Sequence, residues 1–166
     1  MYAKFDRRGP MCLCCVRYIF SNRSQNANGL MKLSAADIDV TARTVYGEAR
    51  GEPRLGRIAV AWVIRNRSIE KNRPPAETAM KKWQFSTWNE NDPNVEKIKR
   101  ITLDNQVFQE CMLAALSVLL GQEPDPTGGA THYYASSIEP PFWTEAPARK
   151  TVIIGHHIFY NNVAYS

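Results

Sequence analysis

The segment TVYGEARGEPRLGRIAVAWVIRNR, residues 44–67, contains the end of one predicted helix, a break and most of a second helix. The first helix is predicted to begin at Ser34, which forms a capping-box pattern with Asp37 three residues later. Apolar residues then recur at helical spacing until the glycines of the segment. Pro53 marks the break, and the second helix is predicted over residues 55–66.

The rest of the chain predicts further helices and then a short β-structure. Residues 72–94 are irregular in composition, with several Pro, Asn and Asp residues. The most hydrophobic helix is predicted over residues 107–119 and ends before Gly121. Two strand-like runs follow at residues 130–136 and 151–161. The predicted fold class is therefore α+β, mainly helical, with a small β-hairpin near the end.

The beginning of the chain differs from the rest. Residues 1–33 include a tract rich in Ser, Asn and Gly, which is typical of disorder, and Met31 stands just before the helix start. We predict that this segment is a disordered extension or comes from an upstream start codon, and that residues 34–166 form one domain. The apolar piece before residue 20 is short, is broken by Arg17 and lacks a signal-peptide cleavage site. The localisation of the protein stays open.

Composition narrows the classes of partner. No apolar run approaches the roughly 20 residues that span a membrane. The net charge of +5 suits a polyanion, but the basic residues are scattered, which argues against nucleic-acid binding. Cys12 and Cys15 have the spacing of a zinc or redox motif, yet no second pair or nearby histidine supports a metal site. Cys111 is predicted to be a small buried hydrophobic residue. The sequence predicts no metal site and no disulfide framework.

A carboxylate stands where the first predicted helix ends. Glu48 follows Gly47, and a helix C-terminus disfavours the ionised form of a carboxylate. A neighbouring apolar wall would act in the same direction and help the group to keep the proton that a general acid requires. The alternative is an exposed glutamate paired with Arg50. Glu52 is predicted either to face solvent or to support the site from behind.

Two other segments are candidates for a binding cleft. Residues 83–88, WQFSTW, concentrate aromatic side chains in a polar stretch, where they either line a cleft or fold back into the core. In the strand-like run ATHYYA, period-two alternation puts Thr131 and Tyr133 on one face and His132 on the other. One face would thus offer a hydroxyl and a phenol to a sugar. The alternative is a half-buried structural strand.

Taken together, these motifs resemble a known family. The stretches TVYGEARGEPRLGRIAVAWVIRNR, QFSTW, DPTGGATHYYA and IGHHIFY occur in this order in the SleB-like cell wall hydrolases, which include spore-cortex-lytic enzymes and related hydrolases of bacteria and phages. The resemblance extends from about Asp39 to Tyr160. It implies a lysozyme-like single domain, with helices around a cleft and a hairpin on one side. Residues 34–166 would then be a cell wall hydrolase catalytic domain.

The resemblance also implies roles for individual residues. Glu48 would be the catalytic acid, and the 84–86 and 131–133 segments would flank a glycan cleft. The residues expected to contact the glycan are Tyr46, Gln84, Phe85, Ser86, Thr131, His132 and Tyr133. No metal or organic cofactor is implied.

The expected reaction is cleavage of peptidoglycan at the β-linkage between N-acetylmuramic acid and N-acetylglucosamine. Most glycosidases use two carboxylates, but Glu52, Glu90 and Asp92 are only loosely placed as partners. The lack of a clearly placed second carboxylate favours a lytic transglycosylase, in which Glu48 is both the general acid and the general base. The expected substrate is the glycan strand of peptidoglycan, and the protein is expected to act as a monomer. Muramidase-type hydrolysis of the same bond and a non-catalytic peptidoglycan-binding module are the alternatives.

Overall fold

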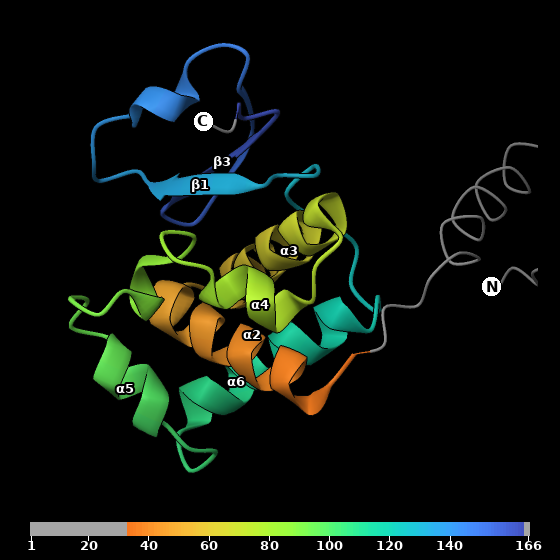
Figure 1. Ribbon diagram of the computed structural model, residues 1–166, viewed down its shortest axis with the longest axis vertical. Helices are drawn as coiled ribbons and strands as arrows, with labels where there is room; N and C mark the ends of the chain where they lie inside the picture. Colours follow the sequence, from red (N-terminus) through yellow and green to blue (C-terminus); the bar gives the residue numbers. More distant parts are fainter. Residues whose placement is uncertain (1–32, 165–166) are drawn as a thin grey trace, which may run out of the picture. The chain divides into compact units, whose positions relative to one another are not determined.

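The computed structural model describes residues 33–164, and Figure 1 shows their arrangement. The expectations for residues 1–32 and for the Cys12 and Cys15 pair lie outside the described residues. The helices are α2 (Ala35–Ala49), α3 (Arg54–Lys71), α4 (Pro75–Met80), α5 (Val95–Arg100) and α6 (Gln106–Leu119), with the 3₁₀ turns η1 (Ser86–Trp88) and η2 (Phe142–Thr144). The strands are β1 (His132–Ala135), β2 (Arg149–Ile154) and β3 (His157–Asn161). The predicted α+β, mainly helical fold is confirmed.

Helix α2 begins with the predicted capping box. The Ser34 hydroxyl accepts a hydrogen bond from the Asp37 backbone N–H at 3.1 Å, and the Asp37 carboxylate accepts one from the Ser34 backbone N–H at 2.8 Å. Asp37 also accepts the backbone N–H of Ala76, in the first turn of α4, at 3.0 Å. One buried carboxylate therefore both starts α2 and fixes the start of α4 against it.

The core lies between the long helices. Helix α2 packs against α3, α4 and α6 (Figure 1), and its buried Val45 contacts the same cluster as Ile58 of α3 and Phe108 of α6. Cys111 of α6 is fully buried there, as predicted, and burial raises the pKa of its thiol to about 11. The predicted end of this helix is also confirmed, since Gly121 follows it with a φ of +72°.

The predicted hairpin is a three-stranded antiparallel sheet, in the order β1-β3-β2. The run at residues 151–161 was expected to be one strand, and that prediction is wrong. Gly155 has a φ of +57°, which a glycine adopts at little cost, so the chain turns back and β2 pairs with β3. Residues 72–94, expected to be irregular, likewise contain the short helix α4 and the turn η1.

The capping network of α2 generates a stability prediction. Replacing Ser34 with Ala should lower the free energy of unfolding by about 1 kcal/mol, the usual cost of losing an N-cap. Asp37→Ala should cost more, because Ala76 also loses its acceptor. Urea denaturation of both variants measures the two losses. Equal losses would show that the contact with Ala76 contributes nothing.

Candidate active site

Glu48, the second-last residue of α2, is half-buried and accepts three hydrogen bonds. The Ser86 hydroxyl and the Thr87 backbone N–H both donate to its Oε1 atom at 3.1 Å. The Tyr133 hydroxyl donates to its Oε2 atom at 2.9 Å. Turn η1 and strand β1 thus hold the carboxyl group from two sides, although Tyr133 is 85 residues away along the chain.

The partners of Glu48 suit a group that gains and loses a proton. Hydroxyl groups donate and accept hydrogen bonds, so Ser86 and Tyr133 can partner the carboxyl in either protonation state. Burial raises the pKa of the Tyr133 phenol well above its ordinary value, and the adjacent charge of Glu48 adds to the effect. Tyr133 therefore stays a neutral phenol beside the carboxyl group.

Gly47 allows η1 to approach α2 beside this carboxyl group. A Cβ atom on Gly47 would lie 1.9 Å from the Thr87 Oγ1 atom, far inside any real contact. One turn earlier on α2, Thr44 accepts a hydrogen bond from the indole N–H of Trp88 at 2.8 Å. Turn η1 is therefore fixed to the helix before and after Gly47, which holds the Thr87 N–H against Glu48.

Arg67 of α3 supports both segments that flank Glu48. Its guanidinium donates to the backbone carbonyl of Gln84 at 2.9 Å and to that of Thr131, and it lies over the Phe85 ring at 4.8 Å. Only 6% of the residue is exposed. Arg67 was not among the residues predicted for the site. Its position four residues after the buried Val63, on the apolar face of the helix, was the available indication.

Only part of the expected glycan-contacting set meets Glu48. Ser86 and Tyr133 bind its carboxyl group directly, whereas Gln84 accepts from Arg67. Phe85 is 3% exposed, so the alternative that the aromatic loop folds back into the core holds for this residue. Tyr46 is also 3% exposed and packs edge-on against Phe108. Both side chains therefore belong to the hydrophobic core.

Strand β1 has the alternation that the sequence predicted. Tyr133 reaches Glu48, while the rings of His132 and Tyr134 both contact Trp143 of η2. The Thr131 hydroxyl is buried and lies 3.0 Å from His132 Nδ1. Burial lowers the pKa of His132 to about 4, and the positive charges of Arg67 and Lys71 contribute. His132 is therefore a neutral ring at physiological pH.

Glu52 does not face solvent, because it is only 8% exposed. Its carboxylate accepts the His156 backbone N–H at 3.1 Å and lies 2.8 Å from His156 Nδ1. Gly155 leaves the necessary space, since a Cβ atom there would lie 1.8 Å from Glu52 Oε2. Burial alone would raise the pKa of Glu52, but the hydrogen bonds from His156 outweigh it and lower the pKa overall. Glu52 thus ties the β2–β3 turn to the segment between α2 and α3.

His157 connects this turn to the site. Its buried ring packs against Tyr133, with centroids 4.8 Å apart, and against Phe159. The contact holds the Tyr133 ring from the side of β3. Within residues 33–164, no three His, Cys, Asp or Glu side chains gather in a way that would hold a metal ion.

The fold and this geometry define a small lysozyme-like domain with one glutamate held between a helical layer and a sheet. A family model described as Cell Wall Hydrolase matches residues 51–160. The chain belongs to this cell wall hydrolase family, which confirms the resemblance inferred from the sequence motifs.

The comparisons with curated proteins agree. The chain is 37% identical over 133 residues to a spore cortex-lytic enzyme of Halalkalibacterium halodurans, covering 75% of this chain and 34% of that protein. It is 31% identical over 134 residues to the spore cortex-lytic enzyme of Bacillus cereus, covering 76% of this chain and 44% of that protein. The chain therefore spans less than half the length of these relatives.

Two solved structures are similar to the chain. One is the catalytic domain of the Bacillus cereus SleB protein, with 31% identity, a TM-score of 0.62, and coverage of 81% of this chain and 94% of that one. The other is the catalytic domain of the germination-specific lytic transglycosylase SleB from Bacillus anthracis, with 30% identity, a TM-score of 0.61, and coverage of 79% and 98%. The match therefore spans nearly all of each solved catalytic domain.

The close approach at Gly47 generates a mutational prediction. Gly47→Ala should lower the free energy of unfolding by about 1–3 kcal/mol, because the new methyl group overlaps Thr87. The matched control is Gly51→Ala, since a Cβ atom at Gly51 meets nothing within 4 Å. Denaturant unfolding compares the two. If both substitutions lower the free energy of unfolding by the same small amount, η1 does not pack against α2 at Gly47.

The buried neutral His132 predicts a pH dependence of stability. Its pKa is about 4 in the folded protein and about 6.5 in an unfolded chain, so between these values the unfolded chain binds the extra proton. The free energy of unfolding should therefore fall as the pH falls from about 6.5 to about 4. His132→Gln should reduce this slope in urea denaturation at a series of pH values. If the free energy of unfolding depends on pH in the same way in both proteins, the lowered pKa of His132 is contradicted.

Proposed function

We propose that this domain cleaves peptidoglycan strands at the β-linkage between N-acetylmuramic acid and N-acetylglucosamine, as a lytic transglycosylase. Glu48 is the single general acid and base. The main support is its carboxyl group, which Ser86, Thr87 and Tyr133 hold in one orientation with partners suited to both protonation states. Membership of the cell wall hydrolase family supports the substrate class.

The proposed reaction has two proton transfers through one residue. Protonated Glu48 donates its proton to the glycosidic oxygen while the bond from that oxygen to C1 of the muramyl ring breaks. An oxocarbenium-like centre develops at C1. The Glu48 carboxylate then takes the proton of the muramyl C6 hydroxyl, and O6 bonds to C1. The products are an anhydro-muramyl end and a free N-acetylglucosamine end, and no water is consumed.

The carboxylates of Glu52, Glu90 and Asp92 are not placed as partners of Glu48, which favours a single-acid mechanism over hydrolysis. Hydrolases of this type need a second carboxylate as nucleophile or as base for water. Glu52 is buried and bound twice by His156. Glu90 and Asp92 line a pocket to which Glu48 does not contribute.

The same proposal specifies which molecules the domain binds. Residues 34–166 act as the catalytic domain, as a monomer, on peptidoglycan glycan strands and not on nucleic acid. The net charge of +5 would help to hold an anionic wall, an effect that salt weakens. Of the helices in residues 33–164, none is long and apolar enough to cross a membrane.

The decisive experiment digests purified peptidoglycan and identifies the products by mass spectrometry. Wild-type protein should release anhydro-muropeptides, and Glu48→Gln should lower the rate by at least about 100-fold, the usual contribution of a general acid. Glu96→Gln is the matched control, because Glu96 is an exposed surface residue paired with Lys99 and Arg100. Products with ordinary reducing ends would instead establish hydrolysis. A wild-type protein that binds the wall but releases nothing would identify a binding module.

A further inference from the structure

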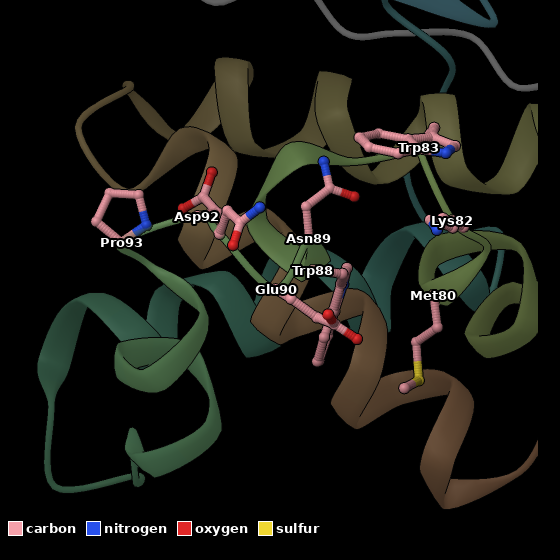
Figure 2. A pocket seen from close by; sticks show the side chains of 9 residues that line it. Met80, Lys82, Trp83, Trp88, Asn89, Glu90, Asp92 and Pro93 are labelled. Atoms are coloured by element: carbon pink, nitrogen blue, oxygen red, sulfur yellow. The ribbon is translucent and has the colours of Figure 1, made fainter.

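A pocket of about 610 Å³ lies beside η1, the turn that contacts Glu48 through Ser86 and Thr87. Its walls come from Met80, Lys82 and Trp83 before η1, from Trp88 at the end of η1, and from residues 89–93 after it. Figure 2 shows side chains of both stretches around the opening. Ser86 and Thr87, which bind Glu48, are in the short segment between the two walls. The pocket and the carboxyl group therefore share one supporting turn.

Trp83 is the most unusual residue of this pocket. It is 74% exposed, and its φ of +68° is a left-handed conformation that costs energy for a bulky residue. Trp88, by contrast, is half-buried, and its indole N–H is bound by Thr44. One large aromatic ring is therefore exposed at the pocket, while Trp88 is anchored to α2. An exposed indole ring is a surface on which a flat apolar face can stack.

The remaining wall combines apolar and polar groups. Met80 supplies apolar surface, and Asn89 supplies an amide that both donates and accepts hydrogen bonds. Glu90 and Asp92 add carboxylate acceptors from the same stretch. An N-acetylated sugar has matching features, because its ring has apolar C–H faces, its acetamido group has a methyl and an amide, and its hydroxyls donate. Pockets that bind small ligands commonly combine an apolar wall with a few such polar groups.

We propose that this pocket is a distal glycan subsite, in which an N-acetylated sugar unit of the strand cut at Glu48 stacks on Trp83. The inference rests on the proposed function, because a polymeric strand bound at Glu48 must continue past the cleaved bond. Trp88, which lines the pocket, directly follows Thr87, whose backbone N–H binds Glu48. Binding energy from such a remote unit supports catalysis at the reacting bond, so longer strands should be better substrates.

A binding measurement tests the subsite directly. The N-acetylglucosamine hexamer, which has no peptide, is titrated calorimetrically into Glu48→Gln protein with and without Trp83→Ala. Loss of the stacking ring should weaken binding about tenfold, and Trp83→Phe should recover most of the loss. Phe142→Ala is the matched control, because Phe142 is an 81% exposed aromatic residue that does not line the pocket. Equal affinity of the Trp83→Ala and parent proteins would overturn the proposal.

A second titration distinguishes a sugar from the peptide stems of the wall. If Trp83→Ala weakens binding of a free stem peptide but not of the hexamer, the pocket recognises peptide and the proposal is wrong. Activity on peptidoglycan separates this inference from the proposed reaction. Trp83→Ala with an intact Glu48 should lower kcat/KM and still yield anhydro products. If it leaves both binding and kcat/KM unchanged while Glu48→Gln is inactive, the subsite fails and the proposed function stands.

Discussion

The contact between Gly47 and Thr87 brings η1 and helix α2 within a distance that no other residue type at position 47 would allow. That distance lets a backbone N–H reach a carboxyl group at the end of the same helix. A glycine near a helix end normally weakens the helix, so its presence here has a cost in helix stability. The gain is a backbone N–H that binds Glu48 in addition to the hydroxyl groups of Ser86 and Tyr133.

Two buried charges join the sheet to the helices and so determine where Tyr133 lies. Arg67 connects α3 to the start of β1, and Glu52 connects the α2–α3 segment to the β2–β3 turn. Buried charges are costly unless they are well paired, and each of these has several hydrogen-bond partners. A shift of the sheet would lengthen these hydrogen bonds and leave a buried charge less well compensated, so both links oppose such a shift. The phenol that contacts Glu48 therefore has a defined position.

The division of roles among the carboxylates follows from their surroundings. Glu48 is half-buried and has two hydroxyl partners, whereas Glu52 is buried and held by His156, with a lowered pKa. The hydroxyl partners of Glu48 can both donate and accept hydrogen bonds, as the proposed acid and base role requires, whereas the hydrogen bonds from His156 favour the ionised form of Glu52. The exposed ring of Trp83 lines the pocket beside η1, where we propose that a sugar unit of the strand stacks. The proposed acid and the proposed sugar subsite thus share one short turn.

Local patterns in the chain were enough to predict the three long helices α2, α3 and α6 and to select Glu48 as a candidate acid. The Ser34–Asp37 capping box, the helical spacing of α2, α3 and α6, and the period-two alternation of β1 all reflect interactions between residues a few positions apart. The ordered motifs then indicated the family and Glu48. Thr87, Arg67 and the Glu52–His156 pair could not be found in this way, because their partners lie 39, 64 and 104 residues away. Such contacts exist only after packing has brought the segments together. The separation of β2 from β3 by the turn at Gly155 was likewise not predicted from local patterns.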